Sequence, residues 1–233
     1  MCLMVKEGKY PPPSPRVPNE IRQRLRAILS YFRECFGQSY YLCLFASVSL
    51  GWMAFGSANI FNLFFAQSLH MSTDTYGKYL ALTFFCSLVL AYPLGVLADR
   101  FHPLRMGLVM MALYVVVALG GGLFATNTGL FAIAFVAHGV ISGAWMTSTA
   151  SLGQMLLPKA KFGQYAAAMN IVNAMGAMTV GPAVGEILDH TGNVYRYTYL
   201  IGSGFALMSL LTGIVLYVQF RKLGGPAYYV APE

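Results

Sequence analysis

Residues 104–125 read LRMGLVMMALYVVVALGGGLFA, and after Arg105 this stretch contains no charged or amide side chain. A helix needs about 20 mostly apolar residues to cross the hydrocarbon core of a bilayer. Backbone N–H and C=O groups have no water to bond at that depth, so they must pair within the segment, which favours a helix. The stretch therefore predicts a transmembrane helix.

Similar apolar stretches occupy most of the chain of 233 residues, which is 57% hydrophobic and 10% charged. Soluble domains carry about a quarter of charged residues, and barrel strands would alternate polar with apolar positions. We therefore expect an all-α integral membrane protein. The six predicted spans are 40–66, 77–98, 104–125, 129–156, 162–188 and 195–220. We expect a cytoplasmic linker over residues 1–39, a transmembrane domain over residues 40–220 and a cytoplasmic tail over residues 221–233.

The positions of the basic residues predict the topology. The chain has 15 Lys and Arg residues and a formal net charge of +7. In a six-span arrangement only Lys78 and Arg196 lie on one side, and all the others lie on the opposite side. Because cytoplasmic loops are enriched in Lys and Arg, we expect both termini to be cytoplasmic and the protein to lie in the plasma (inner) membrane. This placement marks topology, and it excludes nucleic acid as the expected partner.

The segment before the first span has two parts. Residues 5–20 are rich in proline and indicate an extended linker. Residues 21–36, IRQRLRAILSYFRECF, repeat apolar residues at helical spacing and place arginines on other faces, which predicts an amphipathic helix. Such a helix either lies along an anionic inner leaflet or packs on the cytoplasmic face of the protein.

Polar side chains within the spans are the candidate binding residues, because they are costly at membrane depth and commonly face an interior or a wet cavity. Span one has Asn59 and Asn62, three residues apart and so expected on one helix face. The candidates in span four are His138, Ser142 and Trp145, and those in span five are Asn170 and Asn173. The alternative role for them is hydrogen bonding between helices.

A cluster of charge separates spans two and three, in YPLGVLADRFHPLRM, residues 92–106. We expect Asp99 to accept hydrogen bonds from a neighbouring helix start, while Arg100 and Arg105 hold the turn at the surface. Together with Gly95 these residues form a candidate conformational latch. The pattern Gly-x-aliphatic-x-Asp-cation recurs at Gly185–His190, which suggests an inverted repeat of three helices.

GVLADRFHPLR resembles the loop signature of the major facilitator superfamily, G-x-L-a-D-r-x-G-r-[KR]. Gly95, Leu97, Ala98, Asp99, Arg100 and Arg105 align with it, and His102 and Pro103 depart from its Gly-Arg. The resemblance implies a six-helix half whose first and fourth helices line a cavity. Its second and fifth helices would meet a second half, supplied by a separate chain or another copy, and its third and sixth would face outward.

The residues before the first span resemble the linker that precedes a C-terminal half. HMSTDTYGKY and YPLGVLADRFHPLR also look like the glycoside, pentoside and hexuronide cation symporters. The expected function is therefore half of a secondary transporter, which moves a small polar solute across the bilayer by alternating access. The resemblance points to a sugar coupled to H⁺ or Na⁺.

Two other functions are alternatives to transport. One is a non-transporting membrane protein or the remnant of a split transporter. The other is an intramembrane enzyme, which the sequence disfavours because it has neither HExxH nor GxSxG. Cys2, Cys35, Cys43 and Cys86 show no metal-binding spacing, so no metal or cofactor is expected.

Overall fold

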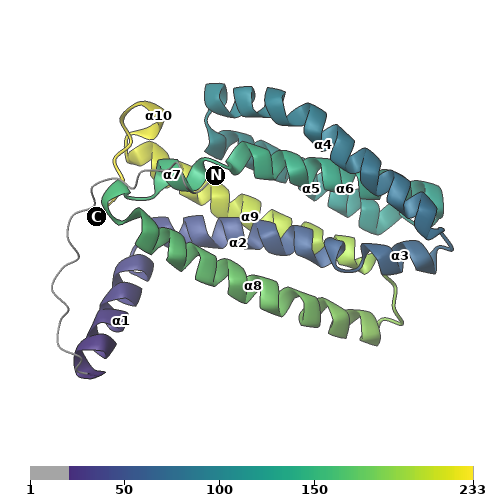
Figure 1. The fold of residues 1–233 in the computed structure, drawn as a ribbon, viewed down its shortest axis with the longest axis horizontal. Coiled ribbons are helices and arrows are strands. Elements are labelled where there is room, and N and C mark those ends of the chain that lie inside the picture. Colours follow the sequence, from purple (N-terminus) through teal and green to yellow (C-terminus); the bar gives the residue numbers. More distant parts are fainter. Residues whose placement is uncertain (1–20, 233) are drawn as a thin grey trace, which may run out of the picture.

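The computed structural model describes residues 21–232, and the regular secondary structure in that range is helical throughout (Figure 1). Six segments there are long and apolar enough to cross a membrane, which confirms the predicted six-span, all-α fold. They are formed by α2 (Ser39–Asn59) with α3 (Asn62–Ser68), α4 (Thr73–Phe101), α5 (Pro103–Phe124), α6 (Thr128–Thr149) with α7 (Leu152–Leu156), α8 (Phe162–His190), and α9 (Tyr197–Lys222). The proline-rich linker lies outside the described residues.

Short polar caps start several of these helices and keep the turns between spans tight. The Ser72 hydroxyl accepts a hydrogen bond from the Thr75 N–H at 3.2 Å, and Asn127 Oδ1 accepts one from the Leu130 N–H at 2.9 Å. Each bond satisfies a backbone donor that has no partner within its own helix. Consecutive spans therefore reverse direction within a few residues.

The contacts between helices show a symmetry between the first three spans and the last three. α2 packs against α8 and α9, α6 packs against α4 and α5, and α5 packs against α9. When spans one, two and three are exchanged with four, five and six, each of these contacts maps onto a contact in the same set. Because consecutive spans are antiparallel, the two triplets are inverted relative to each other.

α4 and α8, the second spans of the two triplets, also share internal features. α4 and α8 are both 29 residues long, and each contains one proline, Pro93 or Pro182. The repeated Gly-x-aliphatic-x-Asp motif lies in the last turns of both, at opposite ends of the bundle. The structure thus has the 3+3 arrangement that the motif suggested.

The spans differ in how much of their surface the bundle covers. In the most apolar part of the first span 50% of residues are buried, against 11% in α4 and 22% in α8. α4 approaches α6 so closely that a Cβ at Gly139 would collide with Thr83, and one at Gly143 with Ser87. Its other face, and most of α8, lies open for lipid or a further protein.

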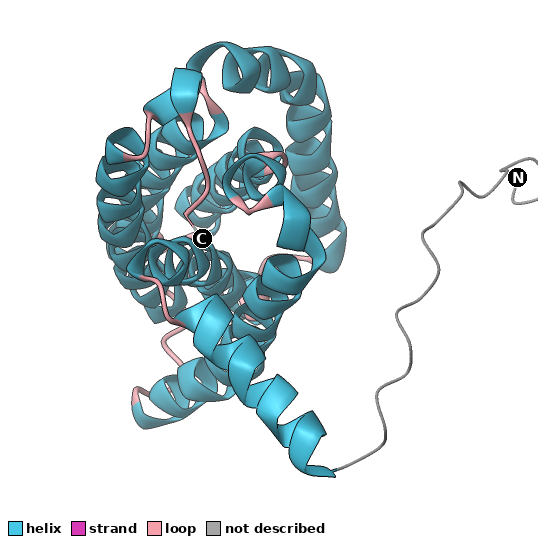
Figure 2. Ribbon diagram, turned by 90° about the vertical axis from the view of Figure 1, so that its left-hand side faces the viewer, coloured by secondary structure: helices cyan, strands magenta, loops and turns pink. Residues whose placement is uncertain are grey.

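The remaining elements gather at one end of the bundle. They are α1 (Ile21–Phe36), η2 (Lys159–Lys161) and α10 (Gly225–Tyr228). The end of α9 and the segment after it fold back onto this end, where the Tyr229 hydroxyl donates to the Leu156 carbonyl and the Tyr41 hydroxyl to the Pro232 carbonyl, both at 2.7 Å. α1 instead leaves the bundle at one corner, beyond the outline of the other helices (Figure 2).

Candidate solute-binding cavity

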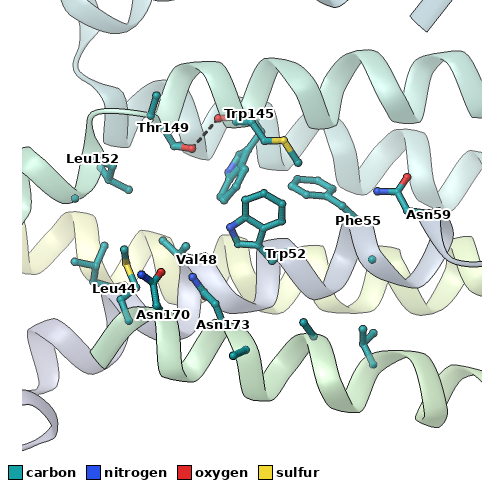
Figure 3. A pocket seen from close by; sticks show the side chains of 18 of the residues that line it. Leu44, Val48, Trp52, Phe55, Asn59, Trp145, Thr149, Leu152, Asn170 and Asn173 are labelled. Atoms are coloured by element: carbon teal, nitrogen blue, oxygen red, sulfur yellow. Dashed lines mark hydrogen bonds between the residues drawn. The ribbon is translucent and has the colours of Figure 1, made fainter. Parts of the chain in front are cut away.

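A cavity of about 760 Å³ lies between α2, α8 and the segment formed by α6 and α7 (Figure 3). Its volume falls in the range of small-molecule sites. Leu44, Val48, Trp52, Phe55 and Asn59 of α2 line it at helical spacing. A cluster of buried apolar residues that includes Leu44, Leu152 and Leu156 forms its end near α7. The three spans that line the cavity are those in which the sequence placed its candidate polar residues.

Aromatic side chains form one wall. The rings of Trp52 and Trp145 meet at 90° with centroids 6.3 Å apart, and Phe55 lies 5.3 Å from Trp145. Trp145 is 6% exposed and Trp52 is 45% exposed. Trp145 therefore packs within the wall and supports Trp52, whose indole is the more accessible to a bound molecule.

The polar part of the lining consists of neutral groups: Asn59, Thr149, Gln154, Asn170 and Asn173. Among residues 21–232, no acidic or basic side chain lines the cavity. The Thr149 hydroxyl donates to the Trp145 carbonyl at 2.8 Å and is thereby occupied. Asn173 Oδ1 is buried, and among the described residues it has no hydrogen-bond partner. A buried amide oxygen normally finds a donor, so Asn173 Oδ1 can accept a hydrogen bond from a molecule in the cavity.

Asn59, which is itself exposed, is held from behind by a chain of hydrogen bonds that runs into the buried interior. Its Oδ1 lies 2.8 Å from His138 Nε2, and His138 Nδ1 lies 2.8 Å from the Tyr114 hydroxyl. Because an amide oxygen can only accept, Nε2 carries a proton. The Tyr114 hydroxyl lies between His138 Nδ1 and the Ala54 carbonyl, which it reaches at 3.2 Å. Figure 3 shows the amide nitrogen of Asn59 on the side toward Phe55, where it can donate to a molecule in the cavity.

The structure brings together four of the seven predicted binding residues: Asn59, Trp145, Asn170 and Asn173. The other three, Asn62, His138 and Ser142, lie outside the cavity lining. His138 is 1% exposed and sits behind Asn59. The Ser142 hydroxyl donates to the Gly139 carbonyl at 3.0 Å, on a buried face of α6. These three side chains face the interior of the protein, where their hydrogen bonds go to other protein groups.

The prediction that Asn59 and Asn62 share a helix face is wrong. The first span is interrupted at Ile60 and Phe61, so the regular spacing on which that prediction depends stops after Asn59. Asn62 is 2% exposed, and its Oδ1 accepts from the Tyr199 hydroxyl of α9 at 2.9 Å. Sequence reasoning also missed Trp52 and Phe55, although both recur with Asn59 along one face of α2.

The sequence of the chain matches a protein-family profile. The profile described as Major Facilitator Superfamily matches residues 10–226, which is nearly the whole chain. The chain belongs to the major facilitator superfamily. The comparisons with curated proteins and with solved structures give no match.

The superfamily loop signature lies at the turn between α4 and α5, and here the expected latch is not formed. Asp99 and Arg100 are exposed, and the described residues include no hydrogen bond or ion pair to Asp99. Gly95 faces open space. Arg105 instead donates from Nε to the Tyr217 hydroxyl of α9 at 2.8 Å. The arginine thus joins the turn to α9.

His102, where the superfamily signature has glycine, has a φ of +79° and a ψ of 130°. That region of backbone space is strained for any residue with a Cβ, which accounts for glycine in the signature. The imidazole compensates by accepting a hydrogen bond from the Leu104 N–H at Nδ1, 3.2 Å away, and by packing on Phe220. Burial and, secondarily, the nearby Arg105 lower the pKa of His102, which keeps Nδ1 free to accept.

Proposed function

We propose that the chain is one six-helix half of a secondary transporter and that its cavity binds a small, neutral, polar solute. The observation that carries this proposal is the neutral lining of the cavity, in which an accessible indole faces amide groups. Apolar pockets with a few placed polar groups are the usual form of small-molecule sites. Membership in a transporter superfamily supports the same assignment.

A sugar is the solute that we propose first. An indole face suits the apolar C–H surface of a sugar ring, and Asn59, Asn170 and Asn173 supply donors and acceptors for its hydroxyl groups. A charged solute would lose its hydration without gaining an ionic partner in this half. For the same reason a coupled H⁺ or Na⁺ would need side chains of the second half.

The second half would cover α4 and α8, the least buried spans. It would be supplied by a separate chain or by another copy of this one. We further propose that the end of the bundle carrying α1 and α10 faces the cytoplasm across the plasma membrane. Arg22, Arg26, Arg33, Arg100, Arg105 and Arg221 lie at that end, whereas Lys78 and Arg196 lie at the other, and basic loops favour the cytoplasmic side.

Binding to the purified chain tests the proposal directly. The protein in detergent is titrated with neutral monosaccharides and, in parallel, with hexuronates, and tryptophan fluorescence is followed. We expect a saturable change with a neutral sugar, and a smaller one in Trp52→Phe, which retains Trp145 as a reporter. Equal responses to neutral and anionic sugars would contradict the neutral site. The absence of any response, together with no uptake in vesicles that contain a co-expressed partner half, would favour a non-transporting protein.

A further inference from the structure

α1 presents an apolar stripe that no other described part of the protein covers. Ile21, Leu25, Ile28, Leu29 and Phe32 recur on one side of the helix at helical spacing, and each is at least 45% exposed. Ile21 and Leu29 are 76% and 68% exposed. These values exclude the packing of the stripe against the protein's own end face, which was one of the two arrangements expected from the sequence.

The C-terminal part of α1 is attached to the bundle through residues 31–35. Cys35 is fully buried, and Glu34 pairs with Lys161 at the start of α8. Gln164 adds a hydrogen bond to Glu34 Oε2 at 3.1 Å, and the Tyr31 hydroxyl donates to the Gln164 carbonyl at 3.3 Å. The attachment fixes one end of α1 beside a membrane span, and the rest of the helix runs obliquely across the axis of the long helices (Figure 1).

The four arginines of α1 lie outside the apolar stripe, and three of them lie along one of its edges. At 100° per residue, Arg22, Arg26 and Arg33 fall together along one edge of the stripe, while Gln23 and Ser30 occupy the opposite side of the helix. Long arginine side chains at such an edge can keep their guanidinium groups in the headgroup layer while the stripe enters the acyl boundary. This distribution is complementary to an anionic lipid surface.

We propose that α1 binds the surface of the bilayer, with its stripe at the acyl boundary and Arg22, Arg26 and Arg33 on anionic lipid headgroups. The surface is within reach, since α1 ends three residues before α2 begins its passage through the membrane. The proposal does not depend on the solute or on transport. It predicts contact that is strengthened by anionic lipid and weakened by salt.

Spin labels on the full chain in lipid nanodiscs test this placement. In a background that lacks the native cysteines, single cysteines are introduced at Leu25 and Leu29 on the stripe and at Gln23 and Ser30 on the polar side. Nanodiscs contain phosphatidylcholine alone or mixed with phosphatidylglycerol. In the mixed lipid we expect the stripe labels to be reached by oxygen and shielded from a water-soluble nickel complex, and the polar-side labels to show the reverse. Substitution of Arg22, Arg26 and Arg33 by Gln should reduce this difference to its value in neutral lipid.

Hydrogen exchange of the unsubstituted chain gives a second measurement that does not depend on replacing Cys35. Amides of residues 21–33 should exchange several-fold more slowly in anionic than in neutral nanodiscs. Stripe labels that are open to the nickel complex in both lipids would overturn the proposal. So would stripe labels shielded from both reagents and indifferent to lipid, which would indicate a protein partner.

Discussion

His138 in α6 donates a hydrogen bond from Nε2 to Oδ1 of Asn59, the last residue of α2, at 2.8 Å. The same ring is hydrogen-bonded through Nδ1 to the Tyr114 hydroxyl of α5, so one buried imidazole joins three helices. It also fixes the orientation of the Asn59 amide, whose nitrogen remains free to face the cavity. His138 is thus a positioning residue for the proposed site, and it does not contact the solute space itself.

His138→Ala should destabilise the protein, because it removes the hydrogen bonds of the imidazole to Asn59 and Tyr114 and leaves space in the buried interior. The Tyr114 hydroxyl keeps the Ala54 carbonyl as a partner at 3.2 Å, and each lost hydrogen bond contributes about 0.5–1.5 kcal/mol. Thermal unfolding in detergent measures the loss. Ser142→Ala is the matched control on the same helix, since its hydroxyl bonds only to the nearby Gly139 carbonyl. Equal effects of the two substitutions would contradict the role of the hydrogen-bond chain.

Tyr199→Phe tests the contact that follows the interruption of the first span. The substitution removes the hydroxyl that donates to Asn62 Oδ1 and leaves a buried acceptor unsatisfied. We expect a loss of about 1–3 kcal/mol in unfolding free energy. Tyr197→Phe, at a less buried position of the same helix, should change stability little. If Tyr199→Phe is neutral, Asn62 has found another partner and α3 is not held by this bond.

The six spans could be predicted because their length and apolar composition act locally, within each segment. The interruption at Ile60 and Phe61 could not, since two apolar residues without proline carry no signal for a break. For His138 the sequence correctly indicated an interior position. Its partners, however, come from helices distant in sequence, so whether it faced a cavity or a neighbouring tyrosine depended on the packed structure.

The attachment of α1 should depend on pH through Glu34. Hydrogen bonds from Lys161 and Gln164 hold the pKa of Glu34 below its usual value of 4.5. The carboxylate therefore stabilises the attachment above that usual value, and this contribution disappears as the pH falls through the lowered pKa. A spin label at Ser30 should become more mobile on acidification, and Glu34→Gln should abolish the dependence. A transition that persists in Glu34→Gln would assign it to another group.

Cysteine labelling distinguishes the revised lining from the set expected from sequence. In a cysteine-free background, cysteines at Trp52, Asn170 and Asn173 should react with a water-soluble thiol reagent, because these residues line the cavity. Cysteines at Asn62 and His138 should react far more slowly, because both side chains are buried. Val116 on α5 is the lipid-side control. Fast reaction at Asn62 and His138 would contradict the assignment of the cavity to the side lined by Trp52, Asn170 and Asn173.

The positive φ of His102 predicts which of two substitutions at this position gives the more stable protein. His102→Ala and His102→Gly both remove the imidazole, with its bond to the Leu104 N–H and its contact with Phe220. Both should therefore be less stable than the unsubstituted protein. Alanine keeps a Cβ at a φ of +79°, whereas glycine adopts this conformation without strain. His102→Gly should thus be the more stable of the two by about 1 kcal/mol or more, within the cost of about 1–3 kcal/mol for a strained residue.

Unfolding of the two variants under identical conditions measures the difference, in which the lost side-chain contacts cancel. If alanine is as stable as glycine, the turn relaxes without its imidazole, and strain does not explain the glycine in the superfamily signature.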